Sequence, residues 1–307
     1  MTTVKLYWSN ICVLHRLEKE HLDKAAARLR EAGIDLQVTH FGIGYPMRMA
    51  EYLAQDGAEI PDIIVSTDLE VFEDPRIFQK LTGHLRDLRA DYPLKADMVG
   101  TDIDQWPELL PFLVIPLVFC SPSADPLGGR ELSFTTVLGE SGVAFGGVGN
   151  SGAKAVIKAL WSHFGREAAI AFARRSSILP MPINAFQQAR TGATQLAIAP
   201  SIYTRVANGV NLHRFYPGEG AIGLPSYIAA HKRVPDDALK QVLGTLLDRS
   251  FCDRFVLEGD LYCALADSAA NPWVDEHGSR FLYPRREWFA SVLPDVFEDI
   301  YASLTSE

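Results

Sequence analysis

The sequence predicts an α/β protein of two lobes, each a mixed, mostly parallel sheet flanked by helices. Strand and helix signals alternate from the N-terminus, and a chain of 307 residues exceeds what one compact core usually holds. Two apolar, strand-like passages, around residues 112–120 and 217–230, bracket a second series of strands and helices. The chain therefore enters the second lobe and later returns to the first. Two hinge crossings of this kind favour closure of the lobes over a ligand.

The first lobe begins with alternating strands and helices. The spacing of apolar residues distinguishes the strands, with a period of two, from the helices, with a period of 3.6. Gly33 marks a helix end. The predicted strands are residues 4–8, 35–41 and 62–66, and the predicted helices are residues 14–29, 47–54 and 75–88. This order implies a parallel sheet with right-handed crossovers, in which a site lies at the carboxyl ends of the strands.

A second α/β series follows the apolar passage that ends near residue 120. Its predicted strands are residues 143–145 and 196–199, and its predicted helices are residues 151–164, 166–175 and 185–190. Later helices are predicted at residues 235–248, 251–258 and 288–304. The predicted boundaries are residues 1–115 for the first part of lobe 1, 116–220 for lobe 2, and 221–307 for the return to lobe 1 with the C-terminal helices.

Charge and hydropathy exclude several classes of protein. The formal net charge is −9 and the basic residues are scattered, which argues against a nucleic-acid partner. The longest apolar run, residues 109–120, is broken by Pro111 and Pro116, so direct membrane insertion is not expected. No basic-then-apolar leader is visible at the N-terminus. As written, the chain is expected to be cytoplasmic, and periplasmic if a signal peptide has been removed.

Enzyme chemistry receives little support from the motifs. The sequence contains no nucleophile elbow, P-loop, HExxH or dinucleotide GxGxxG pattern, so we expect neither an enzyme nor a bound cofactor. Four cysteines form no CxxC pair and no zinc-finger spacing. Cys252 and Cys263 are candidates for pairing in an oxidising compartment, but the sequence does not establish the distance between them.

Three motifs, in order, carry a resemblance to a known family. Residues 61–68 (PDIIVSTD) combine a strand with a polar turn, residues 149–152 (GNSG) open a helix, and residues 218–225 (GEGAIGLP) precede a strand. In this order the sequence resembles the type II periplasmic solute-binding proteins, the receptors of ABC importers, especially the iron-type and small-anion branch. The resemblance covers nearly the whole chain through its order of elements.

The resemblance implies a monomeric receptor that closes its two lobes on a small solute, anionic or metal-associated, as in ABC import. An ABC transporter permease is then a possible partner. Two alternatives stay open on the same scaffold: a cytoplasmic ligand sensor that passes closure to a protein partner, and an enzyme that uses Cys12 or His15. The identity of the ligand does not follow from the sequence, because similar folds accept very different solutes.

Short polar side chains follow two strands of the predicted first-lobe sheet. Ser9 and Asn10 come directly after the first strand, and Ser66 and Thr67 come after the third. These residue types also favour turns and caps. Their position at the carboxyl ends of parallel strands favours the alternative that they bind a polar solute.

Asn150, Ser151 and Gly152 stand at the predicted start of a helix. Free backbone N–H groups and the positive end of the helix dipole attract anions there, and Gly152 admits a close approach to the backbone. The alternative interpretation is that Asn150 or Ser151 simply caps the helix.

Metal ligation has weaker candidates. Tyr203 follows the strand at residues 196–199, where tyrosines of iron-binding members of the family ligate ferric ion. This chain has one tyrosine there rather than an adjacent pair, which argues against direct iron coordination. Cys12 and His15 carry a soft thiolate and an imidazole three residues apart, a spacing that suits a shared metal. No complete ligand set is visible, so an ordinary helix start is the expected alternative.

Overall fold

The structure of the protein is a computed structural model that describes residues 1–11, 14–42, 44–207 and 212–306. The chain divides into two compact units. Unit 1 comprises Met1–Val99, Asp104–Val114 and Pro225–Ala270, and unit 2 comprises Gly100–Ile103, Ile115–Leu224 and Asn271–Glu307. No helix within the described ranges is long and apolar enough to cross a membrane.

Unit 1 is built on a mixed sheet with a parallel core. Its strands follow the order β2 (Ile34–Phe41), β1 (Thr2–Ser9), β3 (Ile63–Ser66), β9 (Ala221–Ala230) and β4 (Leu110–Ser121). Strand β1 runs parallel to both neighbours, whereas β9 runs antiparallel to β3 and the short β10 (Tyr262–Cys263) runs antiparallel to β4. The carboxyl ends of β1, β2 and β3 therefore meet at one edge of the sheet.

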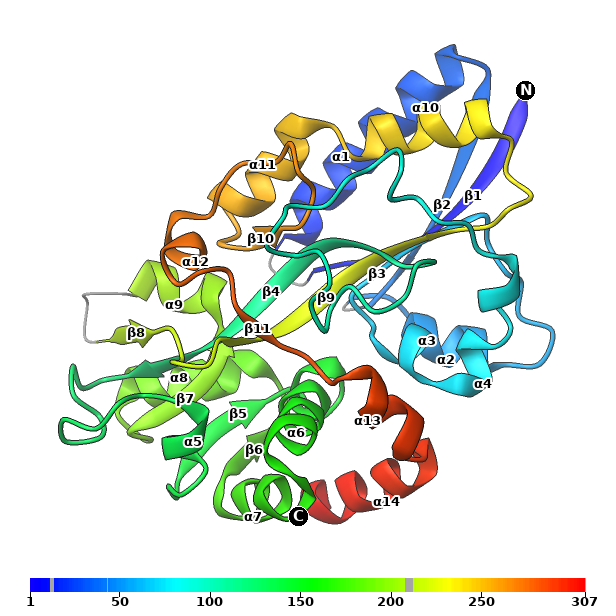
Figure 1. Cartoon of the computed structure of the whole chain (residues 1–307). Coiled ribbons are helices and arrows are strands. Elements are labelled where there is room, and N and C mark those ends of the chain that lie inside the picture. The colour runs from blue at the N-terminus through cyan, green and yellow to red at the C-terminus, as the bar shows by residue number, and fades with distance from the viewer. Residues whose placement is uncertain (12–13, 43, 208–211, 307) are drawn as a thin grey trace. The chain divides into compact units, whose positions relative to one another are not determined.

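Helices cover the unit 1 sheet because each presents an apolar stripe. Helix α1 (His15–Glu31) buries Leu22, Ala25 and Leu29, whose spacing places them on one helical face. Helix α1 packs beside α10 (Asp236–Leu246), and α11 (Arg249–Leu257) follows α10 along the chain (Figure 1). Three short helices lie together elsewhere in this unit: α2 (Met49–Ala54), α3 (Glu70–Glu73) and α4 (Pro75–Phe78).

The strands of unit 2 continue the hydrogen-bonded strand order of unit 1. From β4 the order continues through β7 (Leu196–Pro200) and β5 (Val143–Gly146) to β6 (Ser177–Leu179). Strand β5 is parallel to β7 and to β6, whereas β7 is antiparallel to β4. Two shorter strands complete the pairing, with β8 (His213–Phe215) on β4 and β11 (Phe281–Leu282) on β9.

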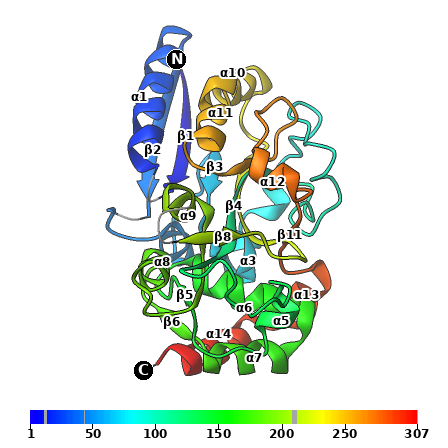
Figure 2. The same cartoon turned by 90° about the vertical axis from the view of Figure 1, so that its left-hand side faces the viewer.

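Helix α6 (Ser151–Phe164) is the longest of the described helices of unit 2. It buries most of its length, and α7 (Arg166–Arg175) follows it after Gly165. Helices α6, α7 and α14 (Pro294–Thr305) lie together (Figure 2). The remaining helices are α5 (Phe134–Val137), α8 (Pro182–Thr191), α9 (Ser201–Ala207), α12 (Pro272–Glu276) and α13 (Arg286–Ser291).

Strands β4 and β9 each contribute to both units. The division falls after Val114 in β4 and after Leu224 in β9. A proline follows closely in both strands, Pro116 in β4 and Pro225 in β9. Proline has no backbone N–H, so each strand gives up one ladder donor near the point where the chain passes from one unit to the other.

Two predicted helices are wrong in extent. The helical spacing over residues 75–88 yields only α4 and a 3₁₀ turn (Thr82–His84). Leu85 instead bridges to His231, and the Arg86 N–H donates to the Ala230 carbonyl at 3.0 Å, so strand-like pairing overrides the helical period. The predicted helix over residues 288–304 is divided into α13 and α14, because Pro294 cannot continue a helix and begins a new one.

The C-terminal segment differs from the predicted boundaries. Residues 221–307 were expected to return to the first lobe, whereas Asn271–Glu307 belongs to unit 2. The physical reason is the packing of α14 and α13 on α6. The Trp161 ring lies 5.9 Å from that of Trp288 and 6.1 Å from that of Phe297, which gives these helices an aromatic contact with α6.

The core of unit 2 gives a direct test of its packing. The buried rings of Phe145 and Phe172 stack with centroids 5.9 Å apart, joining β5 to α7. We expect Phe145→Ala to lower the free energy of unfolding by about 3–5 kcal/mol, because the change leaves a cavity. Urea denaturation measures the loss. Phe164→Ala, at the partly exposed end of α6, serves as the control, and an equal loss in both variants would contradict this packing.

Candidate functional site

Two of the predicted site serines are neighbours at the carboxyl edge of the unit 1 sheet. Trp8 pairs with Val65, so Ser9 and Ser66 end adjacent parallel strands. Both side chains are buried. The Ser66 hydroxyl accepts a hydrogen bond from the Asp68 N–H at 2.9 Å, so it also fixes the turn that contains Thr67. Ser66 thus serves the local turn, as the alternative interpretation of such residues predicts.

Asn10 joins the ends of two strands at this edge. Its backbone N–H donates to the Phe41 carbonyl at 3.1 Å, which ties the end of β1 to the end of β2. A Cβ atom at Gly42 would lie 2.4 Å from the Asn10 Oδ1 atom, and Gly42 has a φ of +101°. Only glycine meets both conditions. The turn after β2 therefore lies directly against the Asn10 side chain.

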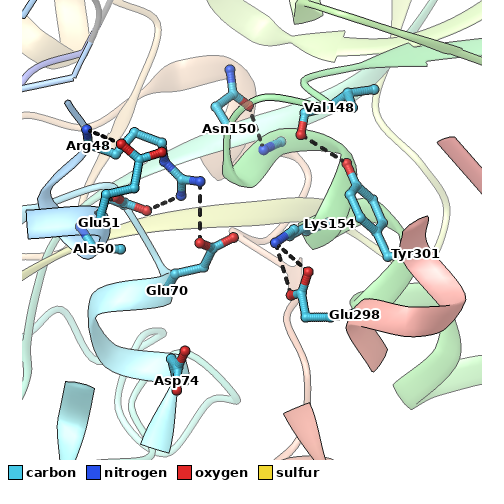
Figure 3. Close-up of polar contacts among 12 residues, drawn as sticks. Arg48, Ala50, Glu51, Glu70, Asp74, Val148, Asn150, Lys154, Glu298 and Tyr301 are labelled. Atoms are coloured by element: carbon cyan, nitrogen blue, oxygen red, sulfur yellow. Dashed lines mark hydrogen bonds and ion pairs between the residues drawn. The ribbon is translucent and has the colours of Figure 1, made fainter. Parts of the chain in front are cut away.

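A charged cluster at the same edge was not predicted. The Arg48 guanidinium pairs with the buried Asp68 carboxylate and lies 3.2 Å from a Glu70 oxygen (Figure 3). Asp68 also accepts from the Ala50 N–H at 3.1 Å. Burial raises the pKa of Asp68, and the positive charge of Arg48 opposes that rise. The two ion pairs hold the segment that follows β2 against Asp68 and Glu70, and they neutralise the charge of Arg48.

Arg48 was not predicted as a site residue because the sequence around it matches no recognised motif. It stands in a Pro-Met-Arg-Met segment with no family signature. The available signal was topological, since Arg48 follows the carboxyl end of β2 just as Ser9 follows that of β1. A residue at this edge is a candidate for solute binding whatever its type.

A buried carboxyl group supports the connection between β1 and α1. Glu18 lies in the first turn of α1 and accepts hydrogen bonds from the Trp8 indole N–H at 3.0 Å and from the Ile11 N–H at 2.9 Å. Burial raises the pKa of Glu18 to about 8, although both hydrogen bonds favour the charged form. Glu18 thereby anchors the Trp8 side chain before Ser9 and Asn10 and the Ile11 backbone after them.

The metal site suggested by Cys12 and His15 is not tested by the described residues. Cys12 lies outside the described residues, and His15 is an exposed residue at the start of α1. Among the residues that the structure describes, no group of three or more His, Cys, Asp or Glu side chains is placed to hold a metal ion. This pair therefore remains a hypothesis from sequence spacing.

In unit 2, Asn150 caps helix α6. Its side-chain oxygen accepts from the Gly152 N–H at 2.8 Å, and the Ala153 N–H donates to the Gly147 carbonyl at 3.3 Å. Two N–H groups of the first turn are thus used within the chain, which reduces the number of donors expected for an anion. Ser151 is buried at the first helical position, where the helix dipole still favours negative charge.

Helix α14 holds the start of α6 in place. The Lys154 ammonium lies 2.8 and 2.9 Å from the two carboxylate oxygens of Glu298, and 5.3 Å from the Tyr301 ring centroid. The Tyr301 hydroxyl donates to the Val148 carbonyl at 3.3 Å (Figure 3). These contacts fix both the helix and the loop that leads to Asn150.

Tyr203 shares an edge of the unit 2 sheet with Asn150. Strands β5 and β7 are parallel, and their carboxyl ends lead to Asn150 and to α9, respectively. The partly buried Tyr203 ring packs against a core cluster and lies 5.9 Å from the Phe186 ring. The Tyr203 ring therefore contributes to the packing of unit 2.

The predicted site residues therefore form one group in each unit. Ser9, Asn10, Ser66 and Thr67 lie at the carboxyl edge of the unit 1 sheet, joined there by Arg48. A second group occupies the corresponding edge of the unit 2 sheet and consists of Asn150, Ser151, Gly152 and Tyr203.

Comparison with solved structures identifies the fold. Apo ferric ion-binding protein A of Pasteurella haemolytica is 13% identical, with a TM-score of 0.70 over 100% of this chain and 97% of that one. A periplasmic binding protein of Actinobacillus pleuropneumoniae, solved with exogenous fructose-6-phosphate bound, is 14% identical, with a TM-score of 0.65 and coverage of 100% and 98%. A two-component system protein that mediates signal transduction is 16% identical, with a TM-score of 0.63 and coverage of 98% and 100%.

These similarities establish the fold and not the ligand. The chain has the α/β fold of the periplasmic binding proteins, with mixed sheets flanked by helices, which confirms the predicted fold class. The resemblance stated from the three sequence motifs is confirmed at the level of structure. No protein-family model and no curated protein sequence matches the chain.

Glu18 predicts a dependence of stability on pH. Its pKa is raised from an ordinary value of 4.5 to about 8, so the folded state holds its proton where the unfolded chain releases it. The free energy of unfolding should therefore fall as pH rises from about 5 to about 8, by at most about 1.4 kcal/mol per pH unit from this group. Urea denaturation at several pH values measures that slope.

The matched variants are Glu18→Gln and Glu20→Gln. An amide does not titrate, so the first variant should lose this part of the slope. Glu20 is exposed on the same helix, and its replacement should leave the slope as in the unsubstituted protein. Identical slopes in all three proteins would show that Glu18 is not the responsible group.

Proposed function

We propose that this chain is a solute-binding protein that closes two lobes on one small, anionic or metal-associated solute, as in ABC import. The observation that carries the proposal is the correspondence of the whole chain to periplasmic binding proteins, including proteins described as ferric-binding and one solved with a sugar phosphate. The location that accompanies this function is the periplasm, and the partner is an ABC transporter permease.

The arrangement of polar groups supports solute binding at the strand edges. In unit 1 the proposed ligand-binding residues are Ser9, Asn10, Ser66 and Thr67, and in unit 2 they are Asn150, Ser151, Gly152 and Tyr203. Carboxyl edges of parallel strands are the usual binding edges of α/β folds. Ordered turns hold these groups in place, which lowers the entropic cost of binding.

An anionic solute fits the local charges. The start of α6 supplies the positive end of a helix dipole in unit 2, whereas the charge of Arg48 in unit 1 is already paired with Asp68 and Glu70. The Tyr203 ring packs against Phe186. We therefore favour a metal that is bound together with its own anion over a metal that is ligated by this tyrosine. Phosphorylated and carboxylated solutes are the proposed class.

The proposed mechanism is a population shift. A solute that binds groups of both units stabilises the closed state only through the contacts made in that state. Pro116 and Pro225, near the points where β4 and β9 pass between units, support bending at these strands because each removes a ladder hydrogen bond. Binding without chemical turnover is part of the proposal.

A ligand sensor is the second candidate. The similarity to a two-component signal transduction protein favours it, because that fold neighbour is described as acting in signalling. Both candidates bind a solute and differ in what recognises the closed state. Capture of a permease by the solute-loaded protein supports import, whereas capture of a signalling protein supports the sensor.

The class of solute is tested by a thermal-shift screen. The probes are inorganic phosphate, citrate, ferric citrate and fructose-6-phosphate, with glucose as the uncharged control. A ligand present at a hundred times its Kd should stabilise the folded state by about 2.7 kcal/mol, which raises the Tm measurably. An increase for glucose alone would contradict the anionic class, and release of a chemically altered probe would favour an enzyme.

Substitution at the start of α6 tests the site. We expect Ser151→Ala to lower affinity for the best anionic probe by about 1–2 kcal/mol, or roughly tenfold, because a hydroxyl donor to a charged group is lost. Cys12→Ser is the comparison and should change affinity little. Isothermal titration measures both. Unchanged affinity for Ser151→Ala beside a collapse for Cys12→Ser would replace this site with a thiolate or metal site.

A further inference from the structure

An ion pair of unit 2 lies one helical turn beyond Ser151. Lys154 follows Ser151 by three residues, so the two residues lie on one face of α6. The Lys154 ammonium contacts both carboxylate oxygens of Glu298, from α14, at 2.8 and 2.9 Å (Figure 3). A cation and an anion of the chain itself are thus paired on the helix face that carries the serine of the proposed site.

The Lys154 ammonium lies near the start of α6. A long side chain on a helix leans over the preceding turn, which here begins at Ser151. The ammonium is also 5.3 Å from the centroid of the Tyr301 ring, and the Tyr301 hydroxyl donates to the Val148 carbonyl at 3.3 Å, in the loop before Asn150. The charge of the lysine therefore adds to the positive end of the helix dipole.

Glu298 is less firmly held than the carboxylate that pairs with Arg48. The Glu298 side chain is 40% exposed, and within the described part of the chain its carboxylate makes hydrogen bonds and an ion pair with Lys154 alone. Asp68 is only 6% exposed and accepts from the Ala50 N–H as well as pairing with Arg48. Glu298 can therefore turn into solvent without leaving a buried polar group unsatisfied, whereas Asp68 cannot.

We propose that Lys154 binds the anionic group of the solute, and that Glu298 is the counterion which the solute displaces. This inference rests on the proposed function and supplies a charged group for it, since two N–H groups of the first turn of α6 are used within the chain and Arg48 is already paired. A carboxylate or phosphate of the solute takes the place of the Glu298 carboxylate, so one charge-assisted hydrogen-bonded pair replaces another. The solute class is a small molecule with one compact anionic group.

Exchange of this kind gives the two partners opposite effects on affinity. Glu298 competes with the solute, because the ion pair must open before the solute binds, so its carboxylate lowers affinity. Lys154 attracts the solute and raises affinity. An ion pair that only stabilises the fold does not produce this opposition, since loss of either partner then weakens the same contact between α6 and α14.

Isothermal titration with inorganic phosphate and with fructose-6-phosphate tests the exchange. Glu298→Gln should tighten binding by about twofold to fivefold, which corresponds to the strength of a partly exposed ion pair. Lys154→Gln should weaken binding about tenfold or more, because a hydrogen bond between two charged groups is lost. Lys154→Arg keeps the positive charge and should retain most of the affinity.

Matched controls separate this local effect from a change in net charge. Asp299→Asn removes one negative charge from the next residue of α14, which is exposed. Lys240→Gln removes one positive charge from an exposed lysine of α10 in unit 1. Neither should change affinity by more than about twofold, because distant exposed charges are screened by salt. Thermal unfolding verifies that each variant is folded, and Glu298→Gln decides the outcome if Lys154→Gln is not.

The results distinguish this exchange from the proposed function itself. Where the unsubstituted protein binds a probe, an unchanged or lower affinity in Glu298→Gln, or an equal gain in Asp299→Asn, overturns the exchange and leaves solute binding intact. Binding by Glu298→Gln alone supports the exchange. Absence of binding in both the unsubstituted protein and Glu298→Gln contradicts the exchange together with the anionic class of solute.

Discussion

Strand β4 carries the backbone from unit 1 into unit 2 and β9 carries it back into unit 1, and this shared use of two strands constrains the rest of the molecule. Every residue of β9 is buried, and so is all of β4 except the partly exposed Ile115. Neither strand can therefore shift register without moving apolar side chains in both units. Further strands pair with both of them, β3 with β9 and β10 with β4 in unit 1, and β7 with β4 and β11 with β9 in unit 2.

The polar groups at the strand edges stabilise local structure, and in the proposed function they also bind the solute. Ser66 closes a turn, Asn150 caps a helix, and Asp68 neutralises Arg48, so each is ordered before a solute arrives. Such order is costly where a polar group is buried, and the hydrogen bonds offset that cost. The buried Glu18 is satisfied in the same way, by the Trp8 indole N–H before Ser9 and Asn10 and by the Ile11 N–H after them. In the proposed site, affinity and folding stability are consequently coupled at these edges.

Local patterns predicted most of the fold, and tertiary contacts decided the rest. Residues 4–8 and 62–66 read as strands because their apolar runs are short, and both form strands in the structure. Residues 75–88 keep a helical period but are drawn into pairing with β9, which no local signal reveals. Charged residues at the site were harder to predict. Arg48 and Glu18 acquire their roles from Asp68 and Trp8, which are distant in sequence.

The central claim is that the two units close over one small solute. Small-angle X-ray scattering of the ligand-free protein and of the protein saturated with the most stabilising anionic probe tests it directly. Closure about β4 and β9 predicts a smaller radius of gyration with the probe, and no such change with glucose. A radius that stays the same at saturating probe, with binding verified by titration in the same buffer, would contradict closure as the mechanism of this protein.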